Sequence, residues 1–261
     1  MLDKAQCIVF KVGTSTLTHR SGKLNLRRLE SLVSVLADLM NEGIRVALVT
    51  SGAIGVGVGK LALDGRPKDT AGKQACATVG QCELMYIYDK LFSQYGYGVG
   101  QLLITKEDVE DEKRHTNLIR TFEKLFEYSV IPIINENDAV AVDEIVYGDN
   151  DSLSAVVAVL IHADALVILT EKDGLFTANP DKYPDAKRIP FVNEITPEIR
   201  ACAGDTASDQ GTGGMATKLH AADIAGAAGI DTYIINGDDP KNIYKLKDGE
   251  DIGTHFAGKG N

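Results

Sequence analysis

The stretch IVFKVGTS (Ile8–Ser15) is an apolar strand that carries one lysine and runs directly into a glycine and two hydroxyl groups. Similar runs rich in valine and isoleucine recur along the chain. They predict further buried strands at Ile44–Val49, Val99–Ile104, Val130–Ile134, Ala165–Leu169 and Thr232–Ile235. Near-continuous apolar strands of this kind are typical of a parallel sheet that is covered on both faces.

Stretches with helical periodicity lie between these strands. In the clearest one, Asn25–Asn41, apolar residues repeat at i, i+3, i+4 and i+7, and Gly43 is a suitable residue to end the helix. The same spacing predicts helices at Gln74–Phe92, Thr116–Tyr128, Ser152–His162 and Lys218–Ala228. Strands that alternate with amphipathic helices indicate an α/β fold with a mainly parallel central sheet.

The composition narrows the class of protein. The 261 residues include 27 lysines and arginines against 37 acidic residues, a net charge of −10, which argues against nucleic acid or an anionic membrane as partner. The longest uncharged apolar stretch, Ala155–Ile161, is far shorter than the roughly 18 residues of a membrane-spanning helix. The four cysteines form no C-x-x-C pair, so we expect reduced, buried thiols in a cytoplasmic protein.

Ligands of open parallel sheets bind beyond the carboxyl ends of the strands, so the residues that follow each strand are the candidates for a site. A lysine in a buried strand, such as Lys11, is unfavourable unless it meets an anion or extends to water. The glycine-rich stretch TSGAIGVGVG (Thr50–Gly59) follows the next strand. Its backbone N–H groups could face an anion, or its glycines could allow a flexible turn or close packing of a helix on a strand.

Two clusters of asparagine and aspartate follow the fourth predicted strand, INENDAV (Ile134–Val140) and YGDNDSL (Tyr147–Leu153). They could be turn and helix-capping residues, or they could bind an ammonium group, orient lysines or reach a metal through water. The fifth strand leads into LTEKDGLFT (Leu169–Thr177), and GTGGMATK (Gly211–Lys218) opens a helix. The second of these suits a phosphate loop, although a surface loop would have a similar composition.

Several familiar motifs are excluded. Gly253–Lys259 has the spacing G-x-x-x-x-G-K, but no serine or threonine follows and no helix can start there, so it is not a P-loop. The chain contains no G-x-G-x-x-G, H-E-x-x-H or G-x-S-x-G, and its five histidines are scattered. These absences argue against dinucleotide-dependent, zinc and Ser-His-Asp enzymes.

In their order along the chain, these motifs and VGQ (Val79–Gln81) resemble the amino acid kinase family, and most closely its glutamate-phosphorylating members. The match runs from Cys7 to Phe256, and the Asn-Glu-Asn-Asp and Gly-Asp-Asn-Asp blocks separate these members from aspartate, N-acetylglutamate, carbamate and uridylate kinases. The resemblance implies a three-layer α/β/α sandwich in a single kinase domain. Residues 1–163 would form the lobe that binds the amino acid, and residues 164–261 the lobe that binds ATP.

The resemblance also implies roles for particular residues. Lys11 and Lys218 would neutralise the transferred phosphoryl group, and Asp151 would hold both lysines in place. The amino acid would bind to Ser51, Gly52, Ala53, Asp138 and Asn150. ATP would bind to Lys11, Thr170, Glu171, Thr212, Gly213, Gly214, Met215, Ala216, Thr217 and Lys218. Many relatives carry aspartate at the position of Glu171. Mg²⁺ would be held through the ATP phosphates, without a direct protein ligand.

The activity implied by the resemblance is ATP-dependent phosphorylation of the side-chain carboxylate of L-glutamate to γ-glutamyl phosphate, the first step of proline biosynthesis. A carboxyl group with a pKa of about 4.3 is already ionised at neutral pH, so the reaction needs charge stabilisation and no general base. The alternatives are a kinase for another small acid and a non-catalytic regulator that binds an amino acid. Two phosphoryl-binding lysines argue against the regulator.

Other expectations follow from the same resemblance. The product hydrolyses readily, and the segment 177–214, which is rich in turn residues, is a candidate to close over the site. Proline is a candidate feedback inhibitor, γ-glutamyl phosphate reductase is a candidate partner, and a homo-oligomer is expected. The C-terminal PUA domain that many members carry is expected to be absent.

Overall fold

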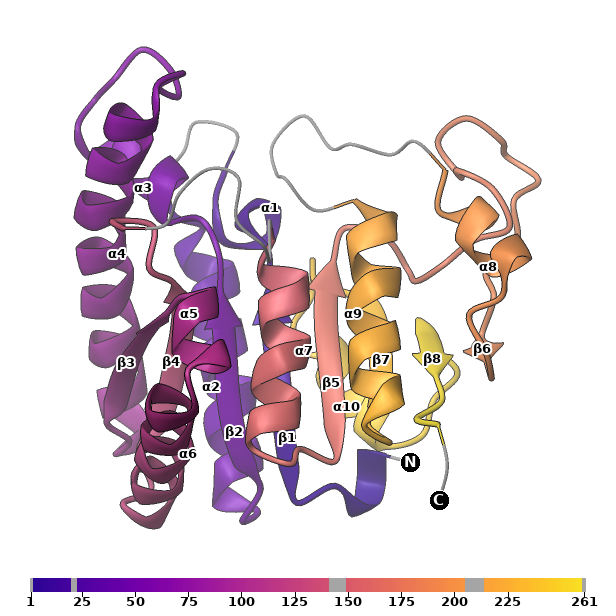
Figure 1. Ribbon diagram of the computed structural model, residues 1–261. Coiled ribbons are helices and arrows are strands. Elements are labelled where there is room, and N and C mark those ends of the chain that lie inside the picture. The colour runs from indigo at the N-terminus through magenta and orange to yellow at the C-terminus, as the bar shows by residue number, and fades with distance from the viewer. Residues whose placement is uncertain (1, 20–22, 141–148, 205–213, 260–261) are drawn as a thin grey trace.

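The computed structural model describes residues 2–19, 23–140, 149–204 and 214–259, and these residues form one eight-stranded sheet (Figure 1). The strand order is β3-β4-β2-β1-β5-β7-β8-β6, and all neighbouring pairs are parallel except β7 and β8. The strands are β1 (Cys7–Val12), β2 (Arg45–Thr50), β3 (Val99–Ile104), β4 (Ile131–Glu136), β5 (Ala165–Thr170), β6 (Phe191–Val192), β7 (Asp231–Asn236) and β8 (Thr254–Phe256).

Helices cover both faces of the sheet. One face packs against α2 (Leu26–Asn41), α4 (Thr70–Phe92) and α10 (Asn242–Lys247), and the other against α6 (Glu112–Glu127), α7 (Asn150–Leu160) and α9 (Met215–Ala227). The shorter helices are η1 (Leu2–Lys4), α1 (Thr14–Leu17), α3 (Ala53–Lys60), η2 (Ser93–Tyr95), α5 (Lys106–Glu110) and α8 (Pro197–Cys202). The predicted three-layer α/β/α sandwich is confirmed.

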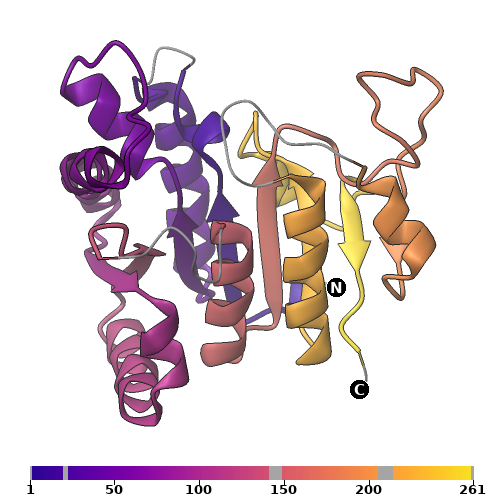
Figure 2. The same cartoon turned by 45° about the horizontal axis from the view of Figure 1, so that its top comes forward.

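The central strand β1 shows how the two layers are divided. Ile8 and Phe10 belong to the core beneath α2, whereas Cys7 and Val9 belong to the core beneath α7 and α9. Successive side chains of a strand point to opposite faces, so Lys11 lies on the face of α7 and α9. Figure 2 shows these two helices side by side, and they contact each other.

The glycine-rich stretch after β2 forms a helix, α3, and not an open loop. A Cβ atom on Gly57 would lie 1.9 Å from the carbonyl oxygen of Cys76, and one on Gly80 would lie 1.8 Å from that of Ala53. Both positions therefore require glycine, because the backbones of α3 and α4 touch. Close packing explains these glycines, although it joins two helices and not a helix and a strand.

The segment that follows β5 also contains more structure than its turn residues predict. It includes β6, which pairs with β8, and α8. Thr254 donates a hydrogen bond of 2.6 Å to the carbonyl of Ile189, and Arg188 pairs with Asp251 at 2.8 Å. These contacts fasten the segment to the edge of the sheet. Residues 205–213 lie outside the described part, and closure of the segment over the site stays a prediction.

The cysteine prediction is confirmed only in part. All four cysteines are free thiols, and Cys7 and Cys76 are buried. Cys82 is exposed and Cys202 is half-exposed, so the prediction of burial is wrong for both. Separately, none of the helices in the described ranges is long and apolar enough to cross a membrane.

Candidate active site

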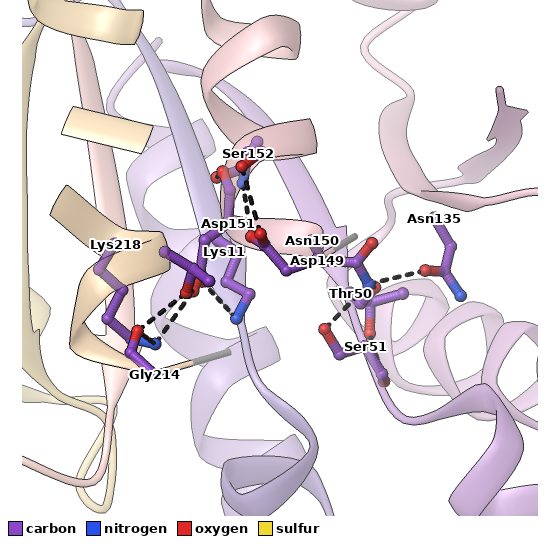
Figure 3. A network of polar contacts seen from close by, with 12 residues as sticks. Lys11, Thr50, Ser51, Asn135, Asp149, Asn150, Asp151, Ser152, Gly214 and Lys218 are labelled. Atoms are coloured by element: carbon purple, nitrogen blue, oxygen red, sulfur yellow. Dashed lines mark hydrogen bonds and ion pairs between the residues drawn. The ribbon is translucent and has the colours of Figure 1, made fainter. Parts of the chain in front are cut away.

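A buried carboxylate with two lysines lies at the carboxyl ends of the central strands (Figure 3). Lys11 comes from β1, Asp151 from the first turn of α7 and Lys218 from the first turn of α9. The Nζ atom of Lys11 lies 2.6 Å from Asp151 Oδ1, and that of Lys218 lies 3.0 Å from Oδ2. Asp151 is fully buried and each lysine is only 6% exposed, so the three charges interact with little screening by water.

The surroundings of Asp151 favour its ionised form. Burial alone would raise the pKa of this carboxyl group, but the charges of Lys11 and Lys218 and the Thr217 hydroxyl at 2.7 Å lower it to about 2. Burial lowers the pKa of Lys218, and Asp151 counteracts this effect. Because both carboxylate oxygens already have partners, Asp151 is poorly suited to bind a metal directly.

Asn150, the residue before Asp151, belongs to a second group of polar side chains. Asn150 Nδ2 lies 2.8 Å from the carbonyl oxygen of Thr50, 2.9 Å from the hydroxyl oxygen of Ser51 and 2.9 Å from Asn135 Oδ1, so these three acceptors share its two N–H groups (Figure 3). Asn135 is buried at the end of β4, and its amide nitrogen donates to Gln81 of α4 at 3.0 Å. We call Gln81, Asn135, Asn150 and Ser51 the amide chain. It joins the ends of β2 and β4 to the start of α7.

Three half-buried carboxylates lie close to one another near the amide chain. Burial, together with the charges of Asp138 and Asp149, raises the pKa of Glu136 to about 7. Burial also raises the pKa of Asp138, although the charge of Arg66 opposes this, and it raises the pKa of Asp149. Asp149 has a structural role as well, because it caps α7 by accepting a hydrogen bond of 2.8 Å from Ser152 N.

The helices that begin at this edge differ in how they are capped. The helices α1, α3 and α9 follow Gly13, Gly52 and Gly214, which provide no side-chain cap. By contrast, α7, which begins at the same edge, is capped by the side chain of Asp149. An uncapped helix start leaves backbone N–H groups without a side-chain acceptor, and such groups suit an anion.

The remaining predicted nucleotide-binding residues divide between two places. Gly214 and Thr217 lie beside Asp151, where Thr217 also bonds to the Gly214 carbonyl at 2.8 Å. The hydrogen bonds described for Thr170 and Glu171 lead instead to the end of β7: the Thr170 carbonyl accepts from Gly237 N at 2.7 Å. Met215 is half-exposed and Ala216 is exposed at the start of α9. Thr212 and Gly213 lie outside the described residues.

Some members of this network carry no predicted role. Asn135 and Gln81 lie inside two sequence motifs that carry the family resemblance, Asn-Glu-Asn-Asp and Val-Gly-Gln, so the sequence contains a signal for both. Tyr88 lies in a region predicted only to be helical. Its buried hydroxyl group is 3.0 Å from Thr50 Oγ1, and nothing in the local pattern indicates this contact.

The mainly parallel sheet and the two buried lysines at the carboxyl ends of its strands define a class of protein, an α/β enzyme with a built site for an anionic group. The sequence profile described as "Amino acid kinase family" matches residues 6–236, and the chain belongs to this family. The glutamate 5-kinase of Clostridium perfringens is 49% identical over 99% of this chain and 97% of its own length. The glutamate 5-kinase of Moorella thermoacetica is 52% identical over 98% of this chain and 68% of its own length.

The solved structures support the fold. Isopentenyl phosphate kinase of T. acidophilum, in a product complex, superposes with a TM-score of 0.67 at 19% identity over 96% of this chain and 99% of that one. Similarity at this level of identity shows the shared fold alone. Together with the relatives, it confirms the predicted resemblance and the predicted kinase class.

Proposed function

We propose that this protein transfers the γ-phosphoryl group of ATP to the side-chain carboxylate of L-glutamate, giving γ-glutamyl phosphate and ADP. The observation that carries the proposal is the convergence of Lys11 and Lys218 on Asp151 at the carboxyl edge of the sheet. Two relatives named glutamate 5-kinases, with 49% and 52% sequence identity to this chain, support glutamate as the phosphoryl acceptor.

The reaction brings two anions together. A carboxylate oxygen of glutamate forms a bond to the γ-phosphorus while the bond from that phosphorus to the β,γ-bridging oxygen breaks, and ADP leaves with the electron pair. The acceptor is already ionised, so no side chain has to remove a proton. Lys11 and Lys218 would offset the negative charge that spreads over the transferred group. Asp151 would keep the two ammonium groups apart and directed to this point.

On the nucleotide side, the start of α9 would bind phosphate through Gly214, Met215, Ala216, Thr217 and Lys218. Thr170, Glu171, Thr212 and Gly213 would complete the ATP site in the proposed lobe 164–261. Within the described ranges, no group of three or more histidine, cysteine, aspartate or glutamate residues could hold a metal ion. Mg²⁺ would be bound through the ATP phosphates, where it would neutralise part of their charge.

On the acceptor side, the proposed lobe 1–163 would bind glutamate. Backbone N–H groups at Gly52 and Ala53 begin a helix that lacks a side-chain cap, and they suit a carboxylate. Ser51 and Asn150 add a hydroxyl group and an amide, and Asp138 adds an acidic group that can pair with an ammonium group. This combination matches an amino acid better than an acid without an amino group.

The proposal extends to the metabolic setting. An acyl phosphate is prone to hydrolysis, so we propose that segment 177–214 closes over the site and that γ-glutamyl phosphate reductase takes up the product in proline biosynthesis. Proline would act as feedback inhibitor. The enzyme would work in the cytoplasm as a homo-oligomer.

An acceptor screen tests the proposal. The protein is incubated with ATP, Mg²⁺ and hydroxylamine, and glutamate, N-acetylglutamate, aspartate and carbamate are offered separately. UMP is followed by ADP release because it gives no acyl phosphate. We expect hydroxamate with glutamate and little with the other acids. If another acceptor is preferred, the assignment of glutamate as the substrate is wrong. Amino acid binding without ADP release would indicate a regulator.

A further inference from the structure

Gln81 is a buried polar residue on an apolar helix face. It lies in α4 and is 6% exposed, and its neighbours on the same face, Ala77, Leu84 and Tyr88, belong to the hydrophobic core. A buried amide is unfavourable unless its hydrogen bonds are made. Its Oε1 atom accepts from Asn135 Nδ2 at 3.0 Å, whereas its Nε2 atom has no partner among the described residues. The hydrogen bond to Asn135 is therefore the contact that explains why a polar residue, Gln81, occupies this buried position.

The backbone N–H of Glu136 requires the carbonyl oxygen of Asn135 as its acceptor, and the contact with Gln81 matches this orientation of the amide. Because Gln81 takes the amino group of Asn135, the carbonyl oxygen Oδ1 is left to accept from Asn150 Nδ2 at 2.9 Å and from Glu136 N at 2.9 Å. A rotated Asn135 would point its amino group at the amino group of Asn150, and two donors cannot bond to each other. Gln81 thus anchors the amino group of Asn135, whose oxygen, together with the Thr50 carbonyl and the Ser51 hydroxyl, accepts from Asn150.

The position of Gln81 is set by helix packing. Gly80 lets α4 approach α3 so closely that a side chain at residue 80 would meet the carbonyl of Ala53. Two turns along the same helix, the Tyr88 hydroxyl lies 3.0 Å from Thr50 Oγ1, at the end of β2. The helix α4 therefore contacts the ends of both β4 and β2, and its place relative to the sheet is defined at two points.

We propose that Gln81 is a positioning residue for the amino acid acceptor, which acts by holding Asn135 in the orientation that Asn150 and Ser51 require. The inference rests on the proposed function, since it assigns the amide chain to the acceptor half of the site. It predicts that Gln81 affects use of glutamate and leaves use of ATP unchanged.

The test is steady-state kinetics of hydroxamate formation by Gln81→Met, which keeps the length of the side chain and removes the acceptor. We expect the KM for glutamate to rise about tenfold, the effect of losing about one buried hydrogen bond, and the KM for ATP to stay within about twofold. Leu84→Met, one turn along on the same buried face, is the matched control and should leave both constants within about twofold. An unchanged KM for glutamate, or an equal rise in both constants, would overturn the proposal.

A double-mutant cycle separates positioning from a general packing defect. If Gln81 acts through Asn135, then Gln81→Met introduced into Asn135→Ala should change the KM for glutamate by less than about twofold. An equal fold-change in the KM for glutamate when Gln81→Met is introduced into the wild type and into Asn135→Ala would overturn the proposal. If Gln81→Met does not fold, Gln81→Glu keeps an acceptor oxygen and should stay within about threefold of the wild type, whereas a loss as large as that of Asn135→Ala would overturn it.

The two proposals fail in different ways. If the wild-type protein makes no hydroxamate from glutamate, the proposed function is wrong. If it does so and the Gln81 variants behave like Leu84→Met, only the role of Gln81 is wrong.

Discussion

Asn150 and Asp151 are adjacent in the first turn of α7, yet they organise two different halves of the site. Asp151 faces two lysines and is fully buried, and its side chain forms two ion pairs and accepts one hydrogen bond from Thr217. Asn150 faces the ends of β2 and β4, and its contacts are hydrogen bonds between neutral groups. One helix start therefore supplies both the charged half and the amide half, and it fixes the distance between them.

The charged half and the amide half differ because the proposed function gives them different tasks, stabilising a phosphoryl group and selecting the acceptor. Lys11, Lys218 and Asp151 together carry one net positive charge, which in a buried place acts strongly on a nearby anion. This local charge is opposite in sign to the −10 of the whole chain, so the net charge of the protein is a poor guide to its ligand. The four side chains of the amide chain are neutral, and their hydrogen-bond geometry suits selection by shape and by donor pattern, while the charge in this half comes from the nearby carboxylates Glu136, Asp138 and Asp149.

The largest effect is expected in the charged half. Lys218→Ala should lower kcat by roughly 10³-fold, because the transferred group loses one of its two cations. The fold should persist, which circular dichroism can check. Lys245→Ala, at an exposed lysine of α10, is the control. Near-normal turnover of Lys218→Ala would remove this residue from the mechanism and with it the division of the site into two halves.

Removal of the central charge should reduce stability. Asp151→Asn leaves Lys11 and Lys218 together without a counter-ion, and we expect a loss of about 3 kcal/mol in the free energy of unfolding. The control is Asp181→Asn, whose exposed ion pair with Lys172 should contribute less than about 1 kcal/mol. Urea denaturation measures both values.

The same variant has a predicted pH dependence. The pKa of Asp151 is about 2 in the folded protein and ordinarily 3.8, so its stabilising effect is complete above pH 4 and is lost as the pH falls towards 2. The difference between wild type and Asp151→Asn should therefore narrow below pH 4. A difference that stays constant between pH 7 and pH 3 would contradict the ion-pair explanation.

In the acceptor half, Asp138→Ala should change the balance between the two substrates. We expect the dissociation constant of glutamate to rise about tenfold and that of ATP to change less than about twofold, as measured by calorimetry. Asp89→Ala, at an exposed position of α4, is the control. Equal losses for both substrates would argue against placing Asp138 with the amino acid.

The smallest effect concerns Glu136. Its pKa is raised from 4.5 to about 7, so between these values the folded protein binds more protons than the unfolded chain, and stability falls as the pH rises. Glu136→Gln removes this penalty and should be more stable relative to wild type at pH 8 than at pH 5, by about 1 kcal/mol after allowance for solvent screening. An identical difference at both pH values in urea denaturation would show that Glu136 does not titrate in this range.

Local sequence patterns predict much of the fold. A buried strand or a long amphipathic helix repeats its signal over many residues, which is why β1 and α2 are predicted within a residue or two. The short strands β6 and β8 repeat too little to show a period. The helix α3 was missed because three of its residues are glycines, which favour turns when judged locally, although one of them, Gly57, is required here by the contact with α4.

The sequence by itself determined the α/β fold, the family and the residue types that gather at the strand ends, because each of these depends on neighbours along the chain. Only the tertiary structure decided how those residues are paired. Lys218 and Asp151 are 67 positions apart, and Gln81 and Asn135 are 54 positions apart. Their contacts arise from the order of strands in the sheet and the close approach of α3 and α4, and no local pattern encodes a distance across the fold.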